Sequence, residues 1–400
     1  MAYTLTREAL LLDLYAAFLC AKRHKGRKPY VVRFEKHLKR NLLLLRDSLW
    51  DRTYRPAPSS CFIIERPKKR EVFAAQFRDR IVHHLYYNYT HTLFERTFIH
   101  DTYSCIPERG THYGIDRLAG HIRKESLSHR RRCYVMKLDI RGYFMHIDRQ
   151  RLLSIALASL EKMRTHRIVK GEKETWQDRI DYDFIRWLTR EIILLDPNEN
   201  CRVHGRESDW TGLDPAKSIR FAANGRGLPI GNLTSQLFSN VYLNLLDQYM
   251  KRTLKCKHYG RYVDDAYVVS HDRWWLLSIV PRVRAFLADA LGLELHMGKV
   301  SVTEAHYGVD FLGAFVKPYR TYASRNCLRR MSRNMARLNM SDTGQVYRSV
   351  NSFLGVLSHY RTYNIRRRLF LRARFLRVAA FSSSITTMNK PFNYKENSYE

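Results

Sequence analysis

The chain has 400 residues, of which 45% are hydrophobic, so it is long enough for two or three domain-sized units, and wholesale disorder is excluded. Its 70 Lys and Arg against 38 Asp and Glu give a net charge of +32, which indicates a polyanionic partner because each neutralised phosphate releases counterions. From Phe311 to Lys395 the only acidic residue is Asp342. This uneven charge favours nucleic acid over a generically basic protein or an anionic membrane surface.

The seven cysteines are scattered and include no C-x-x-C pair, so the sequence supports neither a disulfide framework nor a zinc site. We therefore expect a reducing, cytoplasmic setting. The apolar run from Ala9 to Cys20 is interrupted by Asp13 and is typical of an amphipathic helix, not of a signal peptide. No apolar stretch approaches the roughly 20 residues that a membrane span needs, so no membrane association is expected.

The first part of the chain is predicted to be mostly helical. Residues 1–60 form an N-terminal helical extension, with helices near Thr4–Ala21 and Val31–Trp50. Residues 60–75 are predicted to form two short strands joined by a charged turn around Pro67, and a helix follows.

The middle of the chain alternates strands, loops and helices. The stretch 133–140, CYVMKLDI, is typical of a buried strand, and a helix is expected from about Asp148. Residues 165–225 are polar and rich in loop signals, so they are predicted to be an insertion. A helix should begin near Asn232 or Thr234, either of which would act as its N-cap.

The last part begins with YGRYVDDAYVV, in which strand-forming residues flank Asp264 and Asp265. A helix is then expected over Leu276–Leu291, and two short strands over Lys299–Val302 and Val309–Val316. Arginine-rich helices continue to about Val378, and a polar tail ends the chain.

Two sites place carboxylates at apolar strands. Asp264 and Asp265 suit a tight turn between two strands, and an ordinary hairpin turn would explain them equally well. Asp139 ends the apolar strand YVMKL, where a charge needs compensation unless it caps a helix or forms a core salt bridge. Together the two sites indicate a shared magnesium site, since Mg²⁺ favours a few carboxylates plus water and substrate phosphate. Two such ions, about 3.5–4 Å apart, suit an in-line displacement by a 3′-hydroxyl.

The order of these motifs resembles the palm of a reverse transcriptase. The motifs are the strand with Asp139 and Phe144, GLPIGNLTSQ, Y-V-D-D, LGLELHMGK and GVDFLG, and the similarity runs from about Cys61 to Arg377. The resemblance implies an α+β right-hand polymerase with an antiparallel palm sheet and a helical thumb. The units expected from it are an N-terminal extension 1–60, fingers with part of the palm 61–132, a palm 133–316 with the insertion 165–225, a thumb 317–378 and a tail 379–400.

The same resemblance assigns roles to individual residues. Asp139, Asp264 and Asp265 match the metal ligands for two Mg²⁺ ions, with Mn²⁺ as an alternative. Lys299 matches a general acid for the pyrophosphate, and Arg70, helped by Lys68 and Lys69, matches the contact to the incoming triphosphate. Phe144 matches the aromatic gate against a 2′-hydroxyl, although a core aromatic is an equally ordinary interpretation. The remaining matches are a nucleotide-site segment with Ile230, Gly231 and Gln236, and a primer grip with Phe311, Leu312 and Gly313.

The segment Ile230 to Gln236 reads IGNLTSQ, and it departs from the Gln-Gly-x-x-x-Ser-Pro of most reverse transcriptases. This is similar to the enzymes of diversity-generating retroelements, as are TYSCIPERGTH, WTGLDPAK and NSFLGVLSHY. That subtype implies copying of a template-repeat RNA into adenine-mutagenised cDNA from dNTPs, together with a small basic accessory protein. An apolar Ile230 would remove a hydrogen-bonding check on the nascent base pair.

Other interpretations stay open at the level of sequence. A phage-defence, retron or group II intron-like reverse transcriptase could share this palm. A non-catalytic RNA-binding protein on a degenerate polymerase scaffold is a further alternative, although it would be expected to lose the carboxylates.

Overall fold

The computed structural model describes residues 3–65, 68–169, 171–339, 342–371, 382 and 384–388. Most of the expected tail at 379–400, the last residues of the expected thumb and the centre of the expected turn at Pro67 therefore lie outside the described residues.

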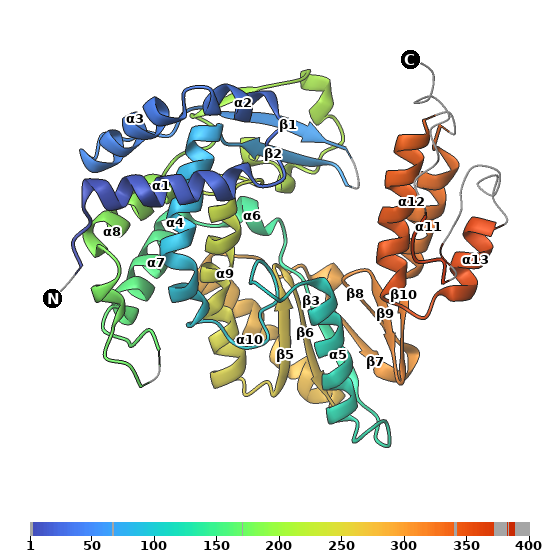
Figure 1. Ribbon diagram of the computed structural model, residues 1–400. Coiled ribbons are helices and arrows are strands. Elements are labelled where there is room, and N and C mark those ends of the chain that lie inside the picture. Colours follow the sequence, from blue (N-terminus) through green and yellow to red (C-terminus); the bar gives the residue numbers. More distant parts are fainter. Residues whose placement is uncertain are drawn as a thin grey trace, which may run out of the picture.

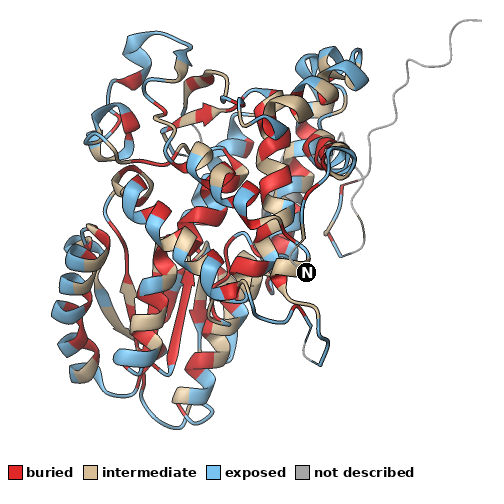
Figure 2. Ribbon diagram, turned by 90° about the vertical axis from the view of Figure 1, so that its left-hand side faces the viewer, coloured by how far each residue is buried: buried red, intermediate tan, exposed pale blue. Residues whose placement is uncertain are grey.

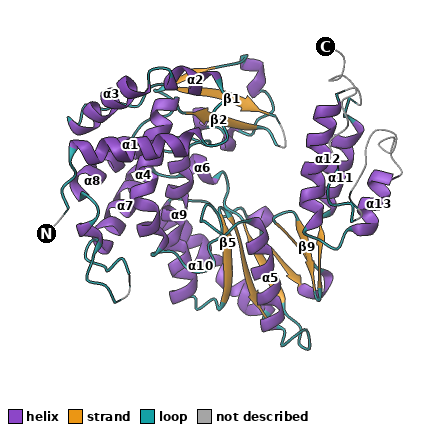
Figure 3. Ribbon diagram, viewed as in Figure 1, coloured by secondary structure: helices purple, strands orange, loops and turns teal. Residues whose placement is uncertain are grey.

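The chain alternates helices with short strands (Figures 1 and 3). The helices are α1 (Arg7–Lys22), α2 (Pro29–Glu35), α3 (Leu38–Trp50), α4 (Phe77–Glu95), α5 (Thr111–Glu125), α6 (Tyr143–His146), α7 (Arg149–Met163), α8 (Tyr182–Ile193), α9 (Leu233–Gln248), α10 (Arg273–Leu291), α11 (Arg325–Ala336), α12 (Thr343–Ser358) and α13 (Tyr363–Leu371). The strands are β1 (Ser59–Ile64), β2 (Arg70–Ala74), β3 (Tyr134–Leu138), β4 (Cys201–Val203), β5 (His258–Tyr262), β6 (Asp265–Ser270), β7 (Ser301–Glu304), β8 (Val309–Phe311), β9 (Ala314–Lys317) and β10 (Arg320–Ala323).

The palm is built on an antiparallel sheet with the strand order β5-β6-β3-β7. Side chains alternate between the two faces of a strand, so each face can pack against a different layer. Val135 and Tyr267 belong to the core that includes α5, whereas Met136 and Val268 belong to the core that includes α9 and α10. The strands β3, β5 and β6 are mostly buried between these helices, as the red central strand in Figure 2 shows, whereas the edge strand β7 is more exposed.

Three of the expected helix boundaries have clear local causes. Asp148 caps α7 by accepting a hydrogen bond from the Arg151 N–H at 2.9 Å. Asn232 is the N-cap residue of α9, but its side chain accepts a hydrogen bond from the Ala75 N–H at 3.4 Å and thereby ties α9 to the strand β2. Gly292 ends α10 in the left-handed conformation, with φ 61°.

The expected helix over Val31–Trp50 is interrupted. It forms α2 and α3, which are separated at Lys36 and His37, where His37 has φ −124° and ψ 38°. The Asn41 side chain donates a hydrogen bond to the Phe34 carbonyl at 2.8 Å and stabilises the break. A periodic apolar pattern does not reveal such a break, because both helices bury residues in the same core.

The fingers consist of the β1–β2 hairpin, joined by β4, and the helices around α4. Figure 1 shows this hairpin on one side of the palm and the helices α11, α12 and α13 on the other. The thumb helices follow the sheet β10-β9-β8. These features confirm the expected α+β class with an antiparallel palm sheet and a helical thumb.

The segment 165–225 is more structured than its polar composition predicts. It contains α8, whose Ile185 and Leu188 are buried in the main core. Further along, Trp210 and Ile219 pack against Phe73 of the fingers hairpin. A few large apolar residues among many polar ones are enough to bury one face, which average polarity does not reveal.

No helix in the described parts of the chain combines the length and the apolar character needed to cross a bilayer.

Candidate active site

The Y-V-D-D sequence forms the turn between β5 and β6. Tyr262 pairs with Asp265, so Val263 and Asp264 form the two-residue connection. Val263 has φ 54°, a conformation that a β-branched residue rarely adopts and that costs about 1–3 kcal/mol. The turn that carries Asp264 is therefore strained and must be held by its surroundings.

Asp139 lies at the same end of the sheet as this turn. In the β3–β6 register Leu138 pairs with Ala266, so the next position on each strand brings Asp139 alongside Asp265. The structure thus brings together carboxylates that are 125 or more residues apart in the chain, as the order of motifs predicts.

Burial and like charge act together on these carboxylates. Burial, followed by the charges of Asp265 and Asp139, raises the pKa of Asp264 to about 6. Burial also raises the pKa of Asp265, although the cations Lys137, Lys299 and Lys68 oppose the shift. The site concentrates negative charge where water cannot fully screen it, and this favours a bound cation.

Lys299 compensates part of this charge. Its ammonium group donates a hydrogen bond to Oδ2 of Asp139. Burial lowers the pKa of Lys299, but the hydrogen bond and the charge of Asp139, with Asp264 and Asp265, raise it overall. The backbone fixes this contact, since the His296 N–H donates to the Asp139 carbonyl and the Lys299 N–H to the His296 carbonyl, both at 2.8 Å.

The cations of the fingers differ in their surroundings. Arg70 is exposed at the start of β2, where it pairs with Ile64. Lys69 donates a hydrogen bond from Nζ to the Thr211 carbonyl at 2.7 Å. Lys68 is exposed, and its charge lowers the pKa of Asp265 against the effect of burial. The charge of Lys68 thus acts on the Asp265 carboxylate.

The segment around Ile230 and Gly231 runs against the fingers hairpin. The Phe73 N–H donates to the Ile230 carbonyl at 2.9 Å. Gly231 has φ 124°, and a Cβ there would lie 2.9 Å from the Phe73 carbonyl oxygen and 3.1 Å from Cγ1 of Val72. Glycine is required at this position by both the conformation and the close approach.

Phe144 and Ile230 are half-buried against the same small core, which contains Phe73 and Trp210. Phe144 lies on the short helix α6, and its carbonyl accepts a hydrogen bond from the Leu228 N–H at 2.8 Å. Gln236 is exposed in the first turn of α9 and accepts a hydrogen bond from the Cys105 thiol at 3.3 Å. The structure thus packs Phe144 and Ile230 against the same small core and places Gln236 in the first turn of α9.

The expected primer grip divides into a core residue and a turn. Phe311 is 2% exposed, and its ring lies edge-on to Tyr267 with centroids 5.1 Å apart. Leu312 and Gly313 form the β8–β9 turn with φ 50° and 86°. Of these three residues, Leu312 and Gly313 are the ones that a bound nucleic-acid strand would contact. The buried Phe311 supports their turn from the core.

Other residues near the carboxylates were missed by reasoning from the sequence. Lys137 is half-buried on β3, and its charge opposes the raised pKa of Asp265. Arg261 and Ser104 contact the backbone of Val263. Arg261 precedes the Y-V-D-D motif inside an apolar strand, which is a signal that could have been used.

The chemistry of the three carboxylates shows whether the site could bind a metal ion. The described residues contain no group of three or more His, Cys, Asp or Glu side chains already arranged to hold a metal ion. The carboxylates of Asp139, Asp264 and Asp265 are nonetheless hard oxygen donors of the kind that Mg²⁺ prefers. Burial first, and then the charges of neighbouring carboxylates, raise the pKa of Asp264 and of Asp265. The chemistry of the donor set therefore fits a divalent cation.

Comparisons with known proteins give one family, one distant curated relative and several solved structures that align with this chain. Residues 67–316 match the family described as reverse transcriptase (RNA-dependent DNA polymerase). The protein YkfC of Escherichia coli (strain K12) is 23% identical over 306 residues, which cover 68% of this chain and 70% of YkfC. Among solved structures, the telomerase of Candida albicans aligns with a TM-score of 0.48, 10% identity, and coverage of 80% of this chain and 56% of that chain. The apo telomerase of Candida tropicalis gives a TM-score of 0.47, 11% identity, and coverage of 79% and 56%.

This chain thus spans less than two thirds of those telomerase chains. The family match covers more than half of the present chain and includes the strand with Asp139, the segment at Gly231 and the turn with Asp264. The chain belongs to the reverse transcriptase family of RNA-dependent DNA polymerases.

Proposed function

We propose that this protein copies RNA into DNA at a site formed by Asp139, Asp264 and Asp265. The observation that carries the proposal is the meeting of these carboxylates at one end of β3 and β6, where burial and mutual charge raise the pKa of Asp264 to about 6. Such a site is stabilised by divalent cations and by a substrate that brings them.

The three carboxylates would hold two Mg²⁺ ions, or Mn²⁺ as an alternative. When bound, such a pair activates an attacking 3′-hydroxyl and stabilises the leaving pyrophosphate. The carboxylates would hold the two ions at the ends of the adjacent strands β3 and β6. Lys299, whose ammonium group contacts Asp139, would donate a proton from Nζ to the leaving pyrophosphate.

The fingers and palm would bind the nucleotide. Arg70, Lys68 and Lys69 supply the cations that a triphosphate needs during phosphoryl transfer. Phe144 would lie under the sugar and exclude a 2′-hydroxyl by steric clash. Leu312 and Gly313 would contact the primer strand.

Primer extension on an RNA template tests this function. The purified protein should extend a DNA primer with dNTPs and Mg²⁺, and Asp264→Asn should lower the rate by about 10³-fold or more because its metal ligation is weakened. Asp289→Asn, at an exposed position on α10, is the matched control and should retain the wild-type rate. Equal rates for wild type and Asp264→Asn would favour a non-catalytic RNA-binding protein.

We further propose that the enzyme serves a diversity-generating retroelement and makes cDNA with errors at template adenines. Ile230 and Gln236 support this subtype, because an apolar side chain beside the nascent base pair cannot provide a hydrogen-bonding check. A small basic accessory protein would be the partner. Sequencing of cDNA from an adenine-containing template should show errors concentrated at adenine, and Ile230→Gln should reduce them. An adenine error rate no higher than that at other bases would reject the subtype and leave the polymerase activity standing.

A further inference from the structure

The strained turn residue Val263 is held on both sides of its backbone. Its N–H donates a hydrogen bond to Oγ of Ser104 at 3.1 Å. Its carbonyl accepts a hydrogen bond from Nη1 of Arg261 at 2.9 Å. Because Val263 has φ 54° and directly precedes Asp264, these two contacts set the direction in which Asp264 leaves the turn.

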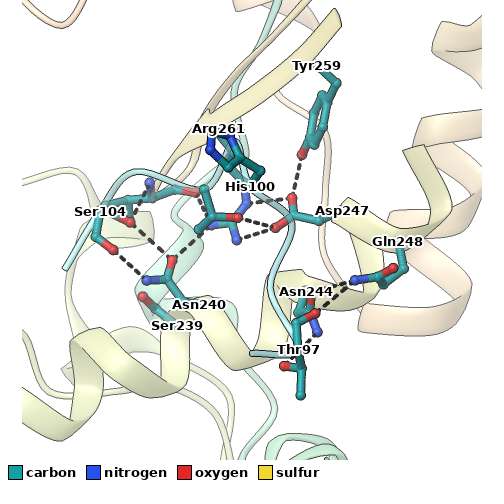
Figure 4. Close-up of polar contacts among 12 residues, drawn as sticks. Thr97, His100, Ser104, Ser239, Asn240, Asn244, Asp247, Gln248, Tyr259 and Arg261 are labelled. Atoms are coloured by element: carbon teal, nitrogen blue, oxygen red, sulfur yellow. Dashed lines mark hydrogen bonds and ion pairs between the residues drawn. The ribbon is translucent and has the colours of Figure 1, made fainter. Parts of the chain in front are cut away.

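Arg261 is itself fixed by a buried ion pair with Asp247, and both residues are 0% exposed. Nε of Arg261 donates to Oδ1 of Asp247 at 2.8 Å, and Nη2 donates to Oδ2 at 2.6 Å. Tyr259 donates to Oδ1 of Asp247 at 2.7 Å (Figure 4). Thr102 donates to Oδ2 of Asp247 at 3.1 Å. The Asp247 carboxylate thus fixes the guanidinium group of Arg261 with two charge-assisted hydrogen bonds, and two hydroxyl donors hold that carboxylate in turn.

Asn240 links Arg261 to Ser104, the two residues that hold the backbone of Val263. Its Oδ1 accepts hydrogen bonds from Nη1 of Arg261 at 3.2 Å and from Oγ of Ser104 at 3.1 Å. Its Nδ2 donates to the Ser104 carbonyl at 2.7 Å (Figure 4). Asn240 and Asp247 are seven residues apart on α9, so two turns of one helix carry both anchors.

A purely stabilising role explains this network poorly. Removing two charges from water costs several kcal/mol per ion, and well-packed apolar residues often replace such pairs without loss of stability. What apolar residues cannot do is hold a backbone carbonyl at a defined position. The contact between Arg261 and the Val263 carbonyl is the feature that a core of leucines would lack.

We propose that Asp247, Arg261 and Ser104 are positioning residues that hold Val263 in its left-handed conformation and thereby orient Asp264 for catalysis. The proposal rests on the proposed role of Asp264 in catalysis. None of the three side chains needs to touch the substrate. Their loss should therefore lower kcat while the KM for dNTP and the affinity for template–primer change little.

Ser104→Ala is the first test, because it removes only the acceptor of the Val263 N–H and one contact to Asn240. We expect kcat for primer extension to fall by about tenfold, and Arg261→Lys to lower it by about 100-fold, in line with the effect of a displacement near 1 Å. Fluorescence anisotropy should show wild-type binding of a labelled template–primer. Thr189→Ala is the matched control, since it removes a buried hydroxyl that contacts Oη of Tyr86 at 3.0 Å, far along the chain from the turn.

A rescue experiment separates positioning from stability. Glycine adopts positive φ without strain, so Val263→Gly should restore part of the activity that Ser104→Ala or Arg261→Lys loses. Val263→Ala removes the same branched side chain without freeing φ and should not restore it. Loss of general core stability would not respond to either substitution, and thermal unfolding monitored by circular dichroism reports that stability directly.

The outcomes are distinct. A lower kcat in Ser104→Ala, with unchanged binding and rescue by Val263→Gly alone, supports the proposal even if Arg261→Lys fails to fold. Wild-type kcat in Ser104→Ala, or a decrease that Val263→Gly does not relieve, overturns it. If the wild-type protein and Asp264→Asn are equally inactive in the same assay, the proposed function itself has failed instead.

Discussion

Gly231 offers a sharp test of how the nucleotide-site segment is held against the fingers. In Gly231→Ala the new Cβ would lie 2.9 Å from the Phe73 carbonyl oxygen, closer than real Cβ contacts allow. Phe73 cannot simply retreat, because it pairs with Cys61 in the β1–β2 hairpin and its N–H donates to the Ile230 carbonyl. Either the hairpin or the segment must shift.

The loss of folding stability that we expect for Gly231→Ala has two parts. The conformation at φ 124° costs an L-residue about 1–3 kcal/mol, and weakening the Phe73–Ile230 hydrogen bond adds about 1 kcal/mol. We therefore expect a destabilisation of about 2–4 kcal/mol in urea unfolding. A shift of the segment should also lower kcat/KM for dNTP by about 10- to 100-fold.

Gly225→Ala is the matched control for this prediction. Gly225 also has positive φ, 77°, but a Cβ added there would meet no atom within 4 Å beyond its own chain neighbours. It should lose about 1–2 kcal/mol from the conformation alone and retain wild-type kinetics. If Gly231→Ala behaves like Gly225→Ala in both measurements, the close approach to Phe73 has no energetic importance and the reasoning is refuted.

Two further predictions concern neighbouring parts of the site. Phe144→Ala should raise the incorporation of ribonucleotides relative to deoxynucleotides by about tenfold or more through loss of a steric clash; single-nucleotide extension measures this ratio, and an unchanged ratio would assign Phe144 to the core alone. Glu71 is 0% exposed and accepts hydrogen bonds from Trp210, Ser218 and the Ile219 N–H at 2.8, 2.9 and 2.6 Å, so Glu71→Gln should destabilise the protein by about 2–4 kcal/mol in urea unfolding. The exposed Glu65 serves as its control, and equal effects of the two substitutions would contradict the importance of the buried contacts.

The palm and its carboxylates could be predicted from the sequence because their signals are local. An apolar strand that ends in Asp139, and a strand–turn–strand pattern around Asp264, are each contained in about ten residues. The order of the motifs then indicated that they meet, and the β3–β6 register brings them to one end of the sheet. The α+β class was implied by the resemblance of this motif order to the palm of a reverse transcriptase.

The parts that escaped prediction depend on contacts between distant segments. Ser104 and Arg261 meet at Val263 although 157 residues separate them. Similarly, the burial of Trp210 depends on Glu71 of the fingers, and nothing within 165–225 reveals that partner. Lys299 was predicted as a proton donor, but its contact with Asp139 arises from the path of the His296 backbone. Such pairings have no periodic signature in the chain.

The N-terminal helices have a consequence for work with shortened versions of the protein. The family match begins at residue 67, yet Leu10, Leu14 and Phe18 of α1 are fully or almost fully buried in the same core as Leu85 of α4. Each such side chain contributes about 1.5–3 kcal/mol when buried, and native proteins are stable by only about 5–15 kcal/mol in total. A truncation at residue 67, where the family match begins, would expose the apolar surface of α4 that α1 covers, and the shortened protein should aggregate. A version made for expression therefore has to include α1.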